Sequence, residues 1–589
     1  MAKLNVPAVP LRVEHNAPIE MRDGTLLRAD IYRPAEGGPF PVLLIRTPYG
    51  EPMLRPVPIL PAVDAGFAVV AQHCRGTGTS DGEFSPFADE AEDGADTIEW
   101  CARQPWSTGA VGMFGPSYLG MVQLAAAASA TPAVTEALRG LVTIVTPADY
   151  HWGLAYRQGA FALGQLLGWH MLKTAQTLGY RAAAGQDVSG EMAALMRLMA
   201  DPASGYRHLP LRDTPAVSGV LPSWRDWVEH EQAGDYWSGL SYKATRHRVA
   251  APVLHVGGWF DLFLGGTLDN FMTLTRDAAT EQARRGQRLI VGPWTHADRS
   301  GTVGELHFGS AASDQGARLE QAQLDFLRRT VRDDPQEPRG PRVRLFVMGD
   351  NVWRDEDEWP LARTEWTPWY LHAGGALSPE RPEESEPSRF TYDPADPTPT
   401  VGGATFLAGG PGGVEWAAGP RDQRAVEARP DVLSFTSAEL TEDLEVTGPV
   451  TVTLYAATSA ADTDFTAKLV DVWPDGRALI VADGIVRARY RDGTGRPSPI
   501  TPGEAHEYTI DLIATSQVFK AGHRLRVDIA GASFPQFDRN PGNGAPSATA
   551  TEEDFVVQHQ TVFHDGARPS HITLPVIPRA AGVARTAGG

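Results

Sequence analysis

Residues 111–130 read VGMFGPSYLGMVQLAAAASA, a short apolar strand followed by a Gly-Pro-Ser corner and an alanine-rich helix. An abrupt strand-to-helix corner holds a serine hydroxyl above its sheet. The backbone N–H groups that open the helix point at the atom that the hydroxyl attacks. This stretch therefore predicts an α/β sheet and makes Ser117 a candidate nucleophile.

The glycine spacing differs from the common nucleophile motif, G-x-S-x-G. Gly115 precedes Ser117 as that motif requires, but Leu119 fills the second glycine position and Gly120 follows it. Because the chain has 60 glycines, such a pattern arises easily by chance, and a solvated turn serine explains it as well. The partners available to the serine must decide between the two.

A serine nucleophile needs a histidine to take its proton and a carboxylate to orient that histidine. Sheets that use such a corner carry these groups in the order Ser, Asp or Glu, His, on loops after later strands. Two apolar runs end this way: APVLHVGGWFD (251–261) at Asp261 and QRLIVGPWTH (287–296) at His296. Parallel strands bring their carboxyl ends to one edge, so the sequence predicts a triad of Ser117, Asp261 and His296.

Three other residues compete for these roles. His73 ends the strand FAVVAQH, but it precedes Ser117 and so breaks the expected order. Asp269 lies in a segment that reads as the next helix, and Asp298 follows His296 too closely to come from a separate strand loop. A solvated face explains both aspartates.

Stabilisation of an oxyanion requires two donors. The backbone N–H after the nucleophile belongs to Tyr118, and the second donor comes from the loop after the third strand. The apolar run PVLLIRTPYG (41–50) places Tyr49 in that loop, and its phenol O–H can donate as a backbone N–H would. A tyrosine that caps the sheet edge is the alternative.

Eight segments spread along the chain resemble one family of enzymes. They are RTPYG (46–50), VVAQHCRGTGTSDGEF (69–84), DTIEWCARQPW (96–106), VGMFGPSYLG (111–120), GGWFDLF (257–263), GPWTH (292–296), VRLFVMGDNVWRDEDEWP (343–360) and DTDFTAKLVDVWPDGRALIVADGIVRARYRD (462–492). Together they look like the bacterial cocaine-esterase-like hydrolases, of the X-prolyl dipeptidyl aminopeptidase and α-amino acid ester hydrolase superfamily. The similarity covers about residues 15–575, and the elbow of this family resembles G-x-S-Y-x-G.

The resemblance implies an α/β-hydrolase sheet and the same Ser117, Asp261 and His296 triad, with Tyr49 and the Tyr118 amide as the oxyanion hole. It also implies a bulky aromatic acyl group, such as benzoyl. The residues that would bound this group are Trp169, Phe263, Phe406 and Leu407. Trp152 is counted with them, although core packing explains Trp152 and Trp259 as well as a pocket role does.

The strand and helix pattern predicts four segments. Residues 1–147 and 243–355 read as two parts of one α/β-hydrolase domain, and 148–242 reads as a helical cap inserted between its strands. From 356 to 589 short alternating runs predict an antiparallel sandwich, for which the resemblance implies a jelly roll. A carbohydrate-binding module is the alternative for this last segment. Packing beside the site is preferred, because the resemblance places Phe406 and Leu407, in the loop 403–416, at the acyl pocket.

Composition restricts partners and location. The net charge of −20 argues against nucleic acid and anionic membranes, and no run approaches the ~18 apolar residues of a membrane span. The start of the chain lacks an apolar signal region. The two cysteines, Cys74 and Cys101, suit a reducing compartment, so a cytoplasmic location is expected. No HExxH motif or Cys/His cluster appears, and no metal or organic cofactor is expected.

The sequence thus predicts a serine carboxylester hydrolase that acts on a small-molecule ester through an acyl-enzyme, with a homo-oligomer left open. The alternative is an X-prolyl dipeptidyl-peptidase or α-amino acid ester hydrolase, which needs carboxylates for the substrate ammonium. The cap offers Asp226, Glu229, Glu231 and Asp235, although a charge run is more often a solvated face. A non-catalytic binding protein on a degenerate hydrolase fold is a third possibility, which the intact triad residues disfavour.

Overall fold

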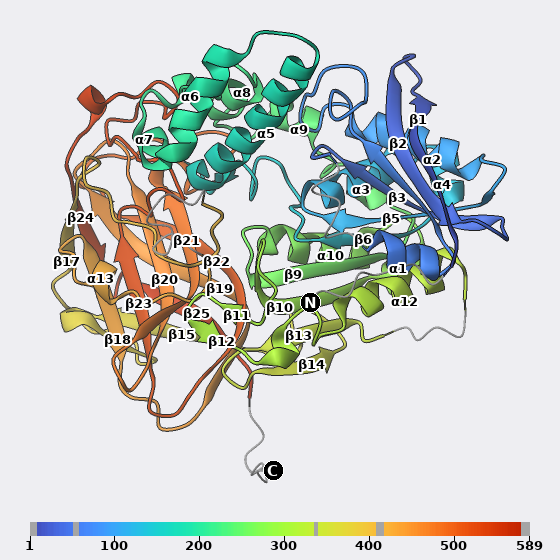
Figure 1. Cartoon of the computed structure of the whole chain (residues 1–589). Coiled ribbons are helices and arrows are strands. Elements are labelled where there is room, and N and C mark those ends of the chain that lie inside the picture. The colour runs from blue at the N-terminus through green and yellow to red at the C-terminus, as the bar shows by residue number, and fades with distance from the viewer. Residues whose placement is uncertain (1–8, 51–57, 335–339, 408–417, 579–589) are drawn as a thin grey trace.

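The computed structural model describes residues 9–50, 58–334, 340–407 and 418–578. A mixed sheet with flanking helices forms one side of the molecule, and a β-sandwich forms the other (Figure 1). A group of helices lies across the top of both. The α/β sheet predicted from the sequence is confirmed, as are the helical insertion and the all-β segment.

The mixed sheet has the spatial strand order β1-β2-β4-β3-β5-β6-β9-β10-β13-β14. Its strands, in that order, are Leu11–Glu20, Leu26–Pro34, Ala68–His73, Phe40–Thr47, Ser107–Pro116, Leu138–Ile144, Val253–Phe260, Arg288–Thr295, Val343–Val347 and Val352–Glu356. From β4 to β13 neighbouring strands are parallel. All their carboxyl ends therefore meet at one edge, where open α/β sheets hold their sites.

Helix α3 (Tyr118–Ser129) follows the serine corner and is buried almost throughout. Its small side chains permit close packing: a Cβ added to Gly94 of α2 (Glu90–Ala102) would lie 2.6 Å from Ala126 Cβ. The alanine-rich sequence thus lets α3 pack closely against α2. The other helices of this layer are α1 (Ile59–Asp64), α4 (Pro132–Ala137), α10 (Leu264–Asp277), α11 (Glu281–Gly286) and α12 (Leu319–Val331).

The cap lies between β6 and β9. Its helices are α5 (Leu163–Ala183), α6 (Ser189–Ala200), α7 (Pro202–Arg207), α8 (Ser223–Glu229) and α9 (Asp235–Leu240). The sequence predicted no strand here, whereas the structure has a two-residue pair, β7 (Tyr156–Arg157) with β8 (Ala160–Phe161). A hairpin this short leaves no readable alternation, which is why the pattern missed it.

The sandwich consists of β15 to β25, with α13 (Arg424–Glu427) beside it. Its strands are Glu365–His372, Ala376–Ser378, Ser388–Tyr392, Val432–Ser437, Leu444–Thr458, Asp464–Val472, Ala478–Arg487, His506–Phe519, Arg524–Ala530, Gln558–Phe563 and His571–Val576. The alternating burial along β19 shows one face turned to the core, as the sequence pattern requires. The sandwich touches the cap directly, since the Phe161 N–H donates to Asp538 Oδ1 at 2.8 Å.

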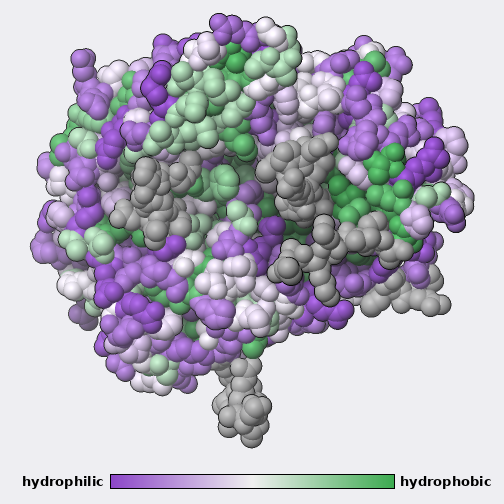
Figure 2. Space-filling model, in the orientation of Figure 1, coloured by the Kyte–Doolittle hydropathy of each residue, from purple (hydrophilic) through white to green (hydrophobic). Residues whose placement is uncertain are grey.

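The visible face of the molecule is mostly hydrophilic, with pale green residues gathered over the cap (Figure 2). Met196 and Met199 of α6, in the cap, are 65% and 52% exposed. In the described part of the chain, no helix is long and apolar enough to cross a bilayer.

Candidate active site

Ser117 occupies the corner between β5 and α3, with φ 58° and ψ −122°. A non-glycine residue in this region is strained, and such strain is common where a side chain must be presented to a substrate. The Ser117 N–H donates to the Ile144 carbonyl at 2.8 Å and anchors the corner to β6. The late glycine has a steric reason: a Cβ at Gly120 would lie 2.0 Å from Thr146 Oγ1.

Asp261 and His296 meet Ser117 from the ends of the neighbouring strands β9 and β10. His296 Nδ1 lies 2.8 Å from Asp261 Oδ1, and His296 Nε2 lies 3.1 Å from Ser117 Oγ. The Asp261 carboxyl is fully buried, so water screens its attraction to the imidazole only weakly. A carboxylate only accepts, and therefore Nδ1 carries the hydrogen and Nε2 is free to take the serine proton.

The competing residues have other partners. His73 Nδ1 accepts from the Thr79 N–H at 3.2 Å. Asp269 pairs with Arg246 at 2.6 Å, and Asp298 accepts from the Ser300 N–H at 2.8 Å.

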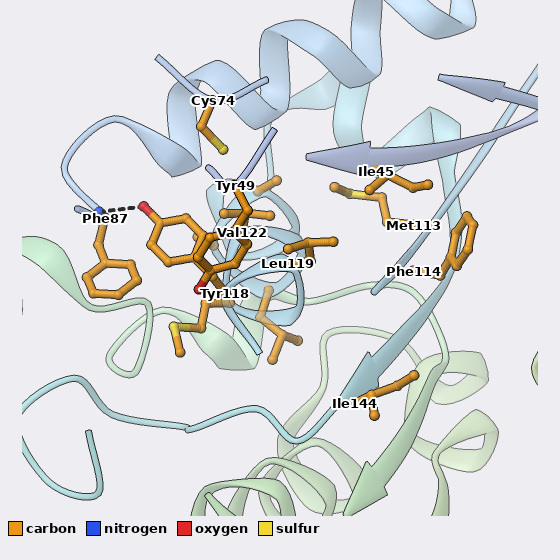
Figure 3. Close-up of a cluster of buried hydrophobic side chains, with 14 of the residues drawn as sticks. Ile45, Tyr49, Cys74, Phe87, Met113, Phe114, Tyr118, Leu119, Val122 and Ile144 are labelled. Atoms are coloured by element: carbon orange, nitrogen blue, oxygen red, sulfur yellow. Dashed lines mark hydrogen bonds between the residues drawn. The ribbon is translucent and has the colours of Figure 1, made fainter. Parts of the chain in front are cut away.

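Tyr49 lies beside Tyr118 at the start of α3 (Figure 3), with ring centroids 6.3 Å apart. Burial raises the pKa of Tyr49 to about 12, against the smaller lowering effects of the neighbouring Trp169 and Ser117 side chains. Trp169 Nε1 donates to Tyr49 Oη at 3.0 Å. The phenol thus stays neutral, receives a hydrogen bond on its oxygen, and keeps its own hydrogen for an acceptor near Ser117.

Buried polar groups hold the Tyr118 ring in place, and the sequence patterns gave no role to them. Tyr118 Oη donates to Glu90 Oε1 at 2.8 Å and accepts from the Phe87 N–H at 3.1 Å (Figure 3). Arg46 lies 2.7 Å from the other oxygen of Glu90. Arg46 belongs to the RTPYG segment, and a charged residue inside an apolar strand was the one signal that pointed to it.

Aromatic side chains surround the catalytic groups. Phe263 and Phe406 present edge-to-face contacts to the His296 ring, at 5.2 and 5.4 Å. Trp169 is stacked between Tyr118, at 6.4 Å, and Trp227, at 5.7 Å. Trp227 was read in the sequence only as part of the cap, and its neighbourhood became visible only once the cap was folded.

The remaining predicted pocket residues, Trp152 and Leu407, lie beside helices α10 and α5. A Cβ on Gly265 of α10 would lie 3.0 Å from Trp152 Cη2, so Trp152 packs over this helix. A Cβ on Gly164 of α5 would lie 2.2 Å from Leu407 Cδ2. Residues 408–416 of the predicted loop lie outside the described residues. Trp259 is buried and donates to the Phe346 carbonyl at 2.7 Å, as a core residue does.

The acidic cap residues do not form one cluster. Glu231 Oε1 accepts from Arg489 Nε of the sandwich at 3.0 Å, and Glu229 lies 3.7 Å from Arg212. Asp226 is half-buried and Asp235 is exposed. Within the described ranges no group of three metal-ligating side chains is found.

Two family models match the chain. The model of X-Pro dipeptidyl-peptidase (S15 family) matches residues 23–298, and that of the X-Pro dipeptidyl-peptidase C-terminal non-catalytic domain matches residues 338–573. The first match contains Ser117, Asp261 and His296. The second covers most of the sandwich.

Individual proteins match over nearly the full length. Cocaine esterase from Rhodococcus sp. (strain MB1 Bresler) is 37% identical over 584 residues, which cover 96% of this chain and 99% of the relative. An α-amino acid ester hydrolase of known structure is 26% identical, with a TM-score of 0.81 over 97% of each chain. An aminopeptidase from a Thaumarchaeota archaeon is 25% identical, with a TM-score of 0.80 over 97% of this chain and 96% of its own.

These relatives are hydrolases, which agrees with the Ser117, His296 and Asp261 arrangement of the site. The esterase shares enough identity over enough of both chains to show common family membership, and the matched models cover both the sheet and the sandwich. The chain is a serine hydrolase that belongs to the X-Pro dipeptidyl-peptidase (S15) family, among its cocaine-esterase-like members.

Proposed function

We propose that this protein hydrolyses carboxylic esters with a bulky aromatic acyl group through an acyl-enzyme on Ser117. The observation that carries the proposal is the unbroken series Asp261, His296, Ser117, with separations of 2.8 and 3.1 Å. A buried carboxylate, an oriented imidazole and a serine on a strained corner are the parts that acyl transfer needs.

The reaction follows from these positions. His296 Nε2 takes the proton of Ser117 Oγ as the oxygen attacks the ester carbonyl, and the resulting oxyanion accepts from the Tyr49 phenol and the Tyr118 N–H. His296 then gives the proton to the departing alkoxide, which leaves as the alcohol. Water repeats both steps on the acyl-enzyme, releasing the acid and restoring Ser117.

An aromatic acyl group fits the surroundings of the reacting atoms. Phe263 and Phe406 lie beside the His296 ring. Trp169 lies beside the Tyr49 phenol. Flat apolar walls favour an aromatic ring by burial and by edge-to-face contact. The 37% identical relative is a cocaine esterase, which agrees with this substrate class.

The second candidate is hydrolysis of α-amino acid esters or X-Pro amides. Two structural relatives, an α-amino acid ester hydrolase and an aminopeptidase, favour it. Such activity requires free carboxylates near the acyl site to hold an ammonium. Glu231 is already paired with Arg489, and Glu229 lies beside Arg212. The ester reading is therefore the better supported of the two.

A fluorophosphonate label followed by an ester panel tests the proposal. The adduct should lie on the peptide that contains Ser117, and aryl esters should be turned over by unlabelled protein only. An adduct on another residue overturns the assignment of the nucleophile. Turnover of amides but not of esters overturns the reaction.

Replacement of Tyr49 by phenylalanine keeps the ring but removes the phenol donor, together with the acceptor of the Trp169 N–H. We expect kcat to fall roughly 10²–10³-fold with little change in KM, because the hydrogen bond strengthens only as the oxyanion forms. Steady-state kinetics on one aryl ester measure this. Tyr392→Phe, at a buried tyrosine of the sandwich, is the control. A raised KM with unchanged kcat identifies Tyr49 instead as a substrate contact.

Benzoate esters should exceed matched phenylglycine esters and X-Pro amides in kcat/KM, by about tenfold or more. An ammonium without a carboxylate partner costs several kcal/mol, roughly, when it is moved into an apolar pocket. The two esters must share one alcohol, and the measurement belongs near neutral pH. A clear preference for the phenylglycine ester or the amide would transfer specificity to the acidic cap residues.

The domain division at residues 147, 242 and 355 stays a prediction, as do a homo-oligomer and the absence of nucleic-acid partners. A cytoplasmic location agrees with the two cysteines, Cys74 and Cys101, which are both buried and free.

A further inference from the structure

A lysine is buried beside the proposed oxyanion hole. Lys173 of α5 is 1% exposed, although lysine is seldom fully buried without a paired charge. Its Nζ donates to the Pro48 carbonyl at 2.5 Å and to Gln176 Oε1 at 2.9 Å. Pro48 directly precedes Tyr49, so the ammonium holds the backbone that carries the phenol.

The ammonium also faces two aromatic rings. Nζ lies 4.2 Å from the centroid of the Phe84 ring and 5.6 Å from that of Tyr49. Both distances lie within the range of an attractive cation–π contact, which is strongest when the cation is desolvated. The buried charge is therefore stabilised partly by the same phenol ring whose O–H lies at Ser117.

One face of α5 makes every one of these contacts. Trp169, Lys173 and Gln176 are four and three residues apart, a spacing that places them in one row on a helix. Trp169 Nε1 donates to the phenol oxygen at 3.0 Å, and Gln176 Nε2 donates to the Tyr49 carbonyl at 2.9 Å. The cap thus touches Tyr49 at its oxygen, its ring and its backbone.

We propose that Lys173 is a positioning residue of the oxyanion hole: it fastens the Tyr49 loop to the cap and keeps a positive charge against the phenol ring. This inference rests on the proposed function. A cation on the ring face strengthens the phenol O–H as a donor to the negative charge that forms on the substrate oxygen. This effect grows toward the transition state, so it raises kcat more than affinity.

The charge of Lys173 is sensitive to pH. Burial lowers the pKa of Lys173 to about 8, while Cys74, directly after β4, and the Glu90 carboxylate of α2 act in the opposite direction. The ammonium is present below pH 8 and is lost as the pH rises through about 8. Activity that depends on this charge must fall over the same interval.

A double-mutant cycle with Tyr49→Phe tests the proposal on an aryl ester. Lys173→Met, a neutral side chain of similar length, should lower kcat about tenfold with little change in KM, and Lys173→Arg should recover most of it. In the Tyr49→Phe background the same change should have little further effect, because Lys173 acts through the phenol. Wild-type kcat should decline as the pH passes about 8, and Lys173→Met should lack this decline.

Lys468→Met is the matched control. Lys468 is also buried and donates to a glutamine oxygen, Gln423 Oε1, at 2.8 Å, but it lies on β20 of the sandwich. The Lys468→Met variant should preserve kcat and the pH profile of kcat even if the substitution lowers the melting temperature.

Two results overturn the role of Lys173 while leaving the proposed function intact. In the first, the wild type is active and Lys173→Met lowers kcat by the same factor in the wild-type and Tyr49→Phe backgrounds. In the second, the pH profile of kcat for Lys173→Met keeps the decline near pH 8. If Lys173→Met does not fold, a wild-type kcat that is flat through pH 8 overturns it as well. Failure of the wild type on all esters instead overturns the proposed function.

Discussion

Ser117→Ala is expected to lower kcat at least ~10³-fold while the protein keeps its fold. The change removes one hydroxyl and opens no large cavity, so the corner between β5 and α3 survives. Without Oγ no acyl-enzyme forms, and only the oxyanion donors and substrate binding remain to accelerate hydrolysis. Turnover of an aryl ester and the thermal unfolding midpoint measure the two halves of this expectation.

The chain supplies a matched control for this variant. Ser223 Oγ lies 3.2 Å from His170 Nε2, so the cap has a second buried serine–histidine pair. The other nitrogen of His170 faces the Leu166 carbonyl, not a carboxylate. Ser223→Ala should therefore retain nearly full activity. A fully active Ser117→Ala, or an inactive Ser223→Ala with an intact fold, would refute the assignment.

Asp261→Asn is expected to lower kcat about 10⁴-fold. The amide has nearly the same shape as the carboxyl, but its NH₂ group can donate to His296 Nδ1 and so favour the wrong tautomer. Nε2 then carries the hydrogen and cannot take the proton of Ser117. The pre-steady-state rate of acylation by a chromogenic ester isolates the affected step.

Asp269→Asn is the control for that variant. Asp269 was one of the two competing carboxylates in the sequence, and it pairs with Arg246. Its neutralisation should change kcat by no more than a few fold, because its carboxylate pairs with Arg246 and it is Asp261 that pairs with His296. If Asp261→Asn retained a tenth of the wild-type rate, the carboxylate would have to lie elsewhere.

The parts of the site that the sequence predicted come from strand ends. Ser117 and His296 are 179 residues apart, yet both follow strands of the parallel part of the sheet. Because parallel strands align their carboxyl ends, order along the chain was enough to predict that the two side chains would meet. Tyr49 was predicted for the same reason, since it lies in the loop that follows β3.

The sheet, the cap insertion, the sandwich and the side chains at the strand ends were all predictable from the sequence, since each follows from local periodicity and turn chemistry. Which side chains of the cap reach the strand ends could not be predicted in this way. Glu231 was open as an ammonium ligand until the docked sandwich placed Arg489 beside it, 258 residues away. No role was assigned to Lys173 from the sequence, because its contact with the Tyr49 loop depends on how α5 packs against that loop. The physical reason is that the partner of a polar side chain depends on desolvation and on what the packed layers bring within 3 Å, and neither is written in the spacing of residues.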